Sequence, residues 1–269
     1  MRPVLRSVVA LPVLGLLAVG LCPGAALAAT ADTSTTTSPT GSTGTVSNPF
    51  CSPALFRAAQ QRAAQALVSR VTQLEALSAL VEAPSSHLSP SDQSTLAHDI
   101  TAVELPGIEA LQPEVQQATT CPQVRQDAHA MVYDYRVYLV MTPQTHETIV
   151  ADRESFAAGR LSALEPTVQS AIAWARAHGR NVTDAESAFG DMQARVSSAT
   201  SALAGVAATV LAQTPTGYPG NAAVFLSART DETNARNDLR SAFDDLAAIA
   251  KDIGVRGAGT AGSTTTTAS

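Results

Sequence analysis

Hydrophobic positions recur at spacings of four and three residues over most of the chain, from residue 52 to about residue 254. This spacing places apolar side chains along one face of an α-helix. The clearest stripe consists of Ala185, Phe189, Met192, Val196, Ala199, Leu203, Val206 and Val210. Its seven-residue repeat predicts an unbroken helix with a partner along its whole length. A capping box from Thr183 to Glu186 is expected to begin this helix.

The last apolar stripe of the chain is a candidate partner for that helix. Leu239, Phe243, Leu246, Ala250 and Ile253 keep the same spacing, and Gly254 follows as a stop signal. The sequence TPTGYPGN, residues 214–221, separates the two stripes and is dense in proline and glycine. A tight connection of this kind predicts that the two helices lie antiparallel.

Two helix starts are marked earlier in the chain by serine followed by proline. Ser52 and Pro53 predict a helix from residue 52 to about Glu82, because serine caps and proline fits the first turn. Ser89, followed by proline, predicts a second helix to about residue 104. Residues 105–120 are expected to be irregular or a broken helix, since they contain Pro106, Gly107 and Pro113.

Three of the four tyrosines fall in the segment VYDYRVYLV, residues 132–140. Local propensity favours a strand here, but no second segment alternates comparably, so a strand would lack a partner for its backbone. We therefore predict a helix within one long element, residues 121–178, that Pro143 kinks and Pro166 bends again.

The predicted fold class is all-α, with long antiparallel helices forming an elongated bundle or coiled-coil-like rod. In the simplest architecture, residues 52–120 pack on the N-terminal half of the long element and residues 184–254 on its C-terminal half. A compact bundle, in which the chain reverses fully at Pro143, is the alternative.

The first residues resemble a secretory leader. Arg2 and Arg6 precede an uncharged apolar run, and Ala26 and Ala28 stand at the small positions of a cleavage site. We expect a secreted, extracytoplasmic protein that is cleaved near Ala28. The predicted organisation is a signal peptide (1–28), a disordered Ser/Thr-rich linker (29–50), a helical region (51–254, with possible sub-bundles 51–142 and 143–254) and a disordered Gly/Thr-rich tail (255–269).

Two cysteines, Cys51 and Cys121, remain after this cleavage. Export exposes a protein to oxidising conditions, so we predict that they form one disulfide. In the chain-entropy model a loop of this length gives roughly 4 kcal/mol of stabilisation. Two unpaired buried thiols are the alternative.

The net charge of the chain indicates which classes of binding partner are expected. The formal net charge is −6, and no basic block stands out, which argues against a nucleic-acid partner. No membrane span is expected after cleavage. The regular stripes make self-association possible, since they can pair between chains as well as within one.

The sequence shows no recognisable catalytic motif. His146 and Glu147 begin like a zinc-protease helix, but Val150 stands where the second histidine is required. Paired carboxylates such as Asp231 and Glu232 are interpreted as solvated helix faces. We therefore predict no catalytic, cofactor-binding or metal-binding residue, no cofactor, and a protein that is not an enzyme.

The stretch YDYRVYLVMTPQTHETIVADR, residues 133–153, resembles a segment of uncharacterised secreted helical proteins of actinobacteria. The resemblance covers about twenty residues and implies export and a long-helix fold. From the residues themselves, Tyr135 and Tyr138 are expected to be core aromatics, with Asp134 and Arg136 facing outward.

These observations favour a structural or interaction module at the cell envelope, with a protein or glycan of the envelope as its partner. The alternative is a carrier of a small, lipid-like apolar ligand. Its groove would lie between helices near Met131, Tyr135, Tyr138 and Met141, which are the candidate interaction residues.

Overall fold

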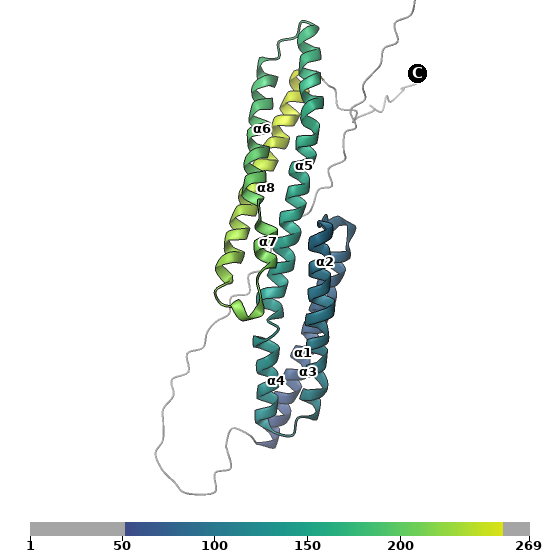
Figure 1. The fold of residues 1–269 in the computed structure, drawn as a ribbon, viewed down its shortest axis with the longest axis vertical. Coiled ribbons are helices and arrows are strands. Elements are labelled where there is room, and N and C mark those ends of the chain that lie inside the picture. The colour runs from purple at the N-terminus through teal and green to yellow at the C-terminus, as the bar shows by residue number, and fades with distance from the viewer. Residues whose placement is uncertain (1–51, 255–269) are drawn as a thin grey trace, which may run out of the picture. The chain divides into compact units, whose positions relative to one another are not determined.

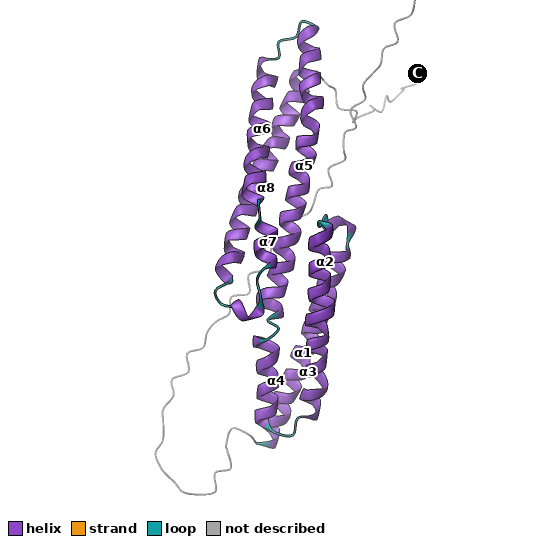
Figure 2. Ribbon diagram, in the orientation of Figure 1, coloured by secondary structure: helices purple, strands orange, loops and turns teal. Residues whose placement is uncertain are grey.

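The computed structural model describes residues 52–254, and these residues form helices and no strand (Figures 1 and 2). The predicted all-α class of long packed helices is therefore confirmed. The predicted signal peptide, the linker and the C-terminal tail lie outside the described residues, and so does Cys51.

The first third of the described chain is a long helix followed by a second helical run beside it. The elements are α1 (Pro53–Glu82), the turn η1 (Pro84–Ser86), α2 (Pro90–His98), the π-helical segment η2 (Asp99–Glu104) and α3 (Leu105–Gln117). Ser52 Oγ accepts a hydrogen bond from the Leu55 amide, and Ser89 Oγ accepts one from the Asp92 amide. Both predicted starts and their serine caps are confirmed.

The expected irregularity after residue 104 is wrong, because α3 is a regular helix of 13 residues. Pro106 is the second residue of α3 and directly follows the π-helical segment η2, and the backbone stays helical across this junction. Pro113 does lie inside the helix. The helix persists around it because Ile108, Leu111 and Val115 are buried on one face, and this packing offsets the lost hydrogen bond.

The long central element is interrupted earlier than predicted. It consists of α4 (Cys121–Tyr133), the π-helical segment η3 (Val137–Met141) and α5 (Thr142–Ala177). The break lies at residues 134–136, where Arg136 adopts a left-handed backbone with φ 41°. Pro143 causes no break: it is the second residue of α5, directly after η3, and the backbone stays helical across this junction. Pro166 lies inside α5.

The remaining elements are α6 (Thr183–Leu203), α7 (Val206–Leu211), the turn η4 (Pro215–Gly217) and α8 (Ala222–Asp252). The predicted unbroken helix is therefore two helices, because Gly205 takes a left-handed conformation with φ 76° between them. Its apolar stripe is nonetheless buried on both sides of the break, apart from Phe189, which is half-buried.

The predicted capping box of α6 does not form. The Thr183 amide and hydroxyl both donate to Asn181 Oδ1, at 3.1 and 2.8 Å. Glu186 pairs instead with Arg176 of α5. The Thr183 hydroxyl is therefore bonded to Asn181, and the Glu186 carboxylate is paired with Arg176. Neither side chain forms the bond that a capping box requires.

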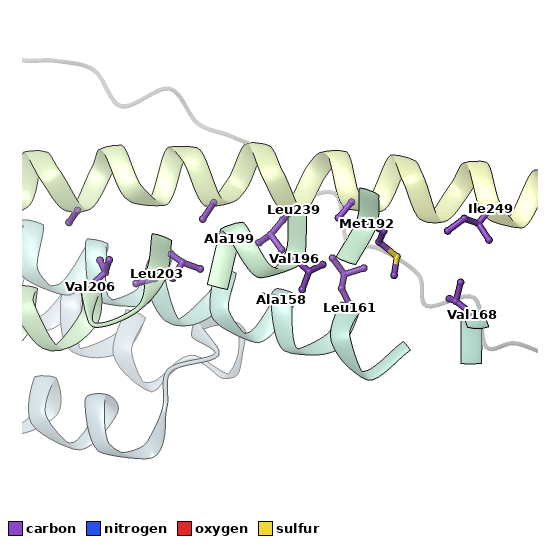
Figure 3. Packing of buried hydrophobic residues seen from close by; sticks show 14 of the residues in the cluster. Ala158, Leu161, Val168, Met192, Val196, Ala199, Leu203, Val206, Leu239 and Ile249 are labelled. Atoms are coloured by element: carbon purple, nitrogen blue, oxygen red, sulfur yellow. The ribbon is translucent and has the colours of Figure 1, made fainter. Parts of the chain in front are cut away.

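One hydrophobic cluster joins α5, α6, α7 and α8. Figure 3 shows its layers, in which Leu161 of α5, Met192 and Val196 of α6 and Leu239 of α8 point toward one another. Arg195 Nε bonds Asp245 at 2.9 Å, and the Ala185 amide bonds Asp252 at 3.2 Å. Since residue numbers fall along α8 as they rise along α6, the predicted antiparallel pairing is confirmed.

A second cluster joins α1, α2, α3 and α4 and includes Leu67, Leu74, Ile108 and Val115. Within the described unit, α4 packs on α1 and α3, while α6, α7 and α8 pack on α5. The helices α4 and α5 follow each other end to end in Figure 1, so the chain does not reverse fully at Pro143.

Among the described residues one segment, Thr183–Leu211, is long and apolar enough to cross a membrane, which the sequence reading did not anticipate. Gly205 interrupts this segment, and its buried positions, among them Met192 and Leu203, belong to the cluster with α5 and α8.

Candidate functional site

The tyrosine-rich segment forms the joint between α4 and α5. The left-handed conformation of Arg136 costs a non-glycine residue roughly 1–2 kcal/mol. Its guanidinium lies between two rings, 4.8 Å from the Tyr133 ring centre and 4.7 Å from that of Tyr218. These cation–π contacts offset part of the strain and connect the joint to the loop before α8.

Tyr135 fills the inner side of the joint. Its ring lies against Gly107 of α3 so closely that a Cβ added to the glycine would overlap it. Burial raises the pKa of the Tyr135 hydroxyl, and the negative charges of Glu104, Asp134 and Glu114 raise it further. The Tyr135 ring thus packs against α3 at a position where only glycine leaves room for it.

Glu104 is a buried acid close to this ring, in the π-helical segment η2. Burial, followed by the charge of Asp99, raises the pKa of Glu104 to about 8. Its Oε2 atom has no hydrogen-bond partner among the described residues. Burial of an ionised carboxylate without a partner is costly, so Glu104 favours its neutral form at neutral pH.

The four predicted interaction residues occupy three different environments. Met131 and Met141 are buried in the cluster around α1, and Tyr135 is half-buried beside it. Tyr138 is 46% exposed and lies under the guanidinium of Arg70, 5.0 Å from it.

The expectation that Tyr138 is a core aromatic is wrong, because the π-helical segment turns Val137 and Val140 inward instead. Arg136, expected to face outward, is half-buried between its two tyrosines.

An open apolar groove of about 470 Å³ lies between α1 and α4. Met131 is the one predicted interaction residue that lines it, together with Leu55, Ala59, Ala63 and Val124. Cys121 also lines this groove, at the first turn of α4. Because Cys51 lies outside the described residues, the Cys51–Cys121 disulfide stays a prediction.

Three histidines form stacks with exposed aromatic rings. The ring centres are 4.4 Å apart for His87 and Phe156, 4.2 Å for His129 and Tyr133, and 4.1 Å for Trp174 and His178. The exposed fractions are 47% for Phe156, 49% for Tyr133 and 60% for Trp174. Among the aromatic residues of the described region, Phe225 alone belongs to the buried core. The three histidine-stacked rings are therefore exposed to solvent, where a partner can reach them.

Charged residues also lie in the interface of α5 and α8, where sequence reasoning did not place them. Glu232, interpreted as part of a solvated face, is 3% exposed. The signal was present in the spacing: Glu147 and Glu154 are seven residues apart, as are Arg229 and Arg236. Within residues 52–254, no group of three or more acidic, histidine or cysteine side chains could hold a metal ion.

No family model, curated protein or solved structure matches the chain.

Proposed function

We propose that the protein is a non-enzymatic helical interaction module that acts outside the cytoplasm, at the cell envelope. Its exposed aromatic side chains are its points of contact with a protein or glycan partner. The observation that carries the proposal is the position of Trp174, the single tryptophan of the chain, at 60% exposure. Tryptophan and tyrosine dominate binding energy at interfaces because they bury large, rigid surfaces.

The supporting pattern is that the fully buried core uses few aromatic side chains. Phe225 is the one fully buried aromatic of the described residues, while Phe156, Tyr133 and Trp174 stack on histidines at the surface. A stacked ring has fewer rotamers to lose on binding, which lowers the entropic cost of a contact. The arrangement suits a scaffold that presents fixed rings on a rigid helix.

The experiment measures binding of the full mature chain to isolated cell envelopes by sedimentation. We expect Trp174→Ala to weaken binding about tenfold or more, as at a hot-spot residue. Leu226→Ala is the matched control, because Leu226 is 66% exposed but is not aromatic. Protease or glycosidase treatment of the envelopes then distinguishes a protein from a glycan partner. Unchanged binding by Trp174→Ala, Phe156→Ala and Tyr133→Ala together would contradict the proposal.

The location outside the cytoplasm rests on the leader-like residues up to Ala28. We expect N-terminal sequencing of the protein from culture fluid or periplasm to begin just after Ala28. A protein recovered from the cytoplasm with its first residues intact would contradict this part of the proposal.

The groove between α1 and α4 favours a second candidate function, the carriage of a small apolar ligand. Apolar side chains make up most of its lining, together with Arg62 and Arg125, and its volume of about 470 Å³ lies in the range of small-molecule sites. Native mass spectrometry of the protein purified from its host tests this function. A bound lipid that is lost on Ala63→Trp would support it, and a ligand-free mass would count against it.

A further inference from the structure

Three glutamates and two arginines meet between α5 and α8. Glu147 and Glu154 lie two turns apart on α5, and Glu232 lies on α8. The three residues are 7%, 8% and 3% exposed, respectively. Arg229 Nε donates a hydrogen bond to Glu147 Oε1 at 2.5 Å, and Arg236 Nε donates one to Glu154 Oε1 at 2.8 Å. Each arginine is thus engaged by one glutamate of α5.

Glu232 is hydrogen-bonded to neither arginine, because Arg229 bonds Glu147 and Arg236 bonds Glu154. It lies on the same face of α8 as these arginines, three residues after Arg229 and four before Arg236. Its Oε1 atom is buried and has no hydrogen-bond partner among the described residues. An ionised carboxylate only accepts hydrogen bonds, so a bond between the carboxyl groups of Glu232 and Glu147 needs one proton.

The surrounding charges make ionisation of Glu232 costly. Burial, followed by the negative charges of Glu147 and Glu154, raises its pKa to about 9, and the positive charge of Arg236 opposes this rise. Arg153 is the other cation acting on Glu154.

The helices on the other side add no charge. Residues 202–210 of α6 and α7 lie across a groove from residues 223–231 of α8, and residues 199–211 contain no titratable side chain. The two inter-helix arginines are bonded to Glu147 and Glu154, so Glu232 is the acid of the three that has no hydrogen-bonded arginine.

We propose that Glu147 and Glu232 form a proton-binding site, in which one proton held between the two carboxyl groups is required for the packing of α8 on α5. With the proton in place, Glu147 stays paired with Arg229 while Glu232 donates to it. When the proton leaves at alkaline pH, two adjacent buried carboxylates repel each other and the interface loses stability. This inference is independent of the proposed envelope partner.

The first experiment detects the proton by nuclear magnetic resonance on the full mature chain, with carbon-13 in the glutamate carboxyls. Glu104 also has a raised pKa, so the variant Glu104→Gln serves as the background. In this variant we expect one glutamate carboxyl to remain protonated at neutral pH. Addition of Glu232→Gln, which keeps the size and a hydrogen-bond donor, should remove that signal. The absence of the signal in Glu104→Gln, or its survival in the double variant, would overturn the proposal.

The second experiment measures the effect of the proton on folding. The urea midpoint of the Glu104→Gln background should fall as the pH rises from about 6 to about 9, with a slope that corresponds to one proton. The further substitution Glu232→Gln should flatten this slope. Asp244→Asn, an exposed carboxyl on the same helix, should leave it unchanged. Equal slopes in all three variants would overturn the proposal.

Discussion

Single residues at the joint between α4 and α5 explain why the tyrosines cluster there. Arg136 takes a left-handed backbone and lies between Tyr133 and Tyr218, while Tyr138 supports Arg70. Tyr135 occupies the space that Gly107 leaves open. Of the three tyrosines in the segment, Tyr135 thus packs inward, while Tyr133 and Tyr138 are exposed.

The contact between Gly107 and Tyr135 yields a direct prediction. Gly107→Ala adds a Cβ where the Tyr135 ring now lies, so the ring must move and the joint must repack. We expect a loss of about 1–3 kcal/mol in the free energy of unfolding, measured by urea denaturation. Gly159→Ala is the control, because a Cβ there meets nothing and a helical glycine is replaced, which should stabilise by about 0.5–1 kcal/mol. Equal stability of the two variants would contradict the packing described for Tyr135.

The raised pKa of Glu104 predicts how stability depends on pH. The folded protein holds this proton up to about pH 8, whereas the unfolded chain releases it near the ordinary value of 4.5. Folding therefore binds a proton in this range, and stability falls as the pH rises. We expect Glu104→Gln to remove about 4 kcal/mol of that fall between about pH 5 and about pH 9. Glu109→Gln, which changes an exposed acid of the adjoining helix α3, should not change it.

At the scale of elements, the sequence predicted the helices with clear local signals. Ser52 and Ser89 cap their helices as expected, and the stripe around Met192 and Val196 is buried as expected. These features depend on residues within a few positions of one another, so a single sequence contains them. The buried positions of this stripe followed from the helical spacing of its apolar residues alone.

The breaks between elements were not predictable from the same signals. Arg136 has no local preference for a left-handed backbone, and it is held there by Tyr218, which lies far along the chain. Gly205 was visible inside the stripe, but glycine is also tolerated within helices, so its spacing did not reveal a break. The carboxyl cluster around Glu232 also required partners from two distant helices.

Two glutamines cap the ends of helices that are distant in sequence. The Gln144 amide donates to the carbonyls of Val210, Leu211 and Gln213 at the end of α7, at 2.8–3.4 Å. Gln60 of α1 caps the end of α3 in the same way. Each long helix thereby supplies the donors that a neighbouring helix end lacks.

The burial of Gln144 makes its cap the more sensitive of the two. Gln144 is 2% exposed, so Gln144→Leu leaves carbonyls unpaired where water does not reach them easily. We expect a loss of about 2 kcal/mol in unfolding free energy, against about 1 kcal/mol for Gln60→Leu at its half-buried site. The result to look for by thermal and urea denaturation is this order; the reverse order would contradict the role given to burial.

At the scale of the whole molecule, the disulfide remains to be tested. Cys121 lies in the first turn of α4, and α4 packs on α1, whose cap Ser52 directly follows Cys51 in sequence. We expect the intact oxidised protein to be lighter by two hydrogens than the reduced protein, and Cys51→Ser to lose roughly 4 kcal/mol of stability. Peptide mapping that recovers both cysteines alkylated without reduction would contradict this prediction.

Helices α4 and α5 form one interrupted element that does not fold back, and each of its halves supports its own set of packed helices. Spin labels on exposed Gln126 and Gln169, introduced as non-canonical residues to keep the cysteines, test it by pulsed dipolar spectroscopy. An end-to-end arrangement predicts a separation of roughly 60 Å, from the rise of 1.5 Å per residue. A full reversal near Pro143 would instead bring the labels to about 20 Å, and that result would contradict the account.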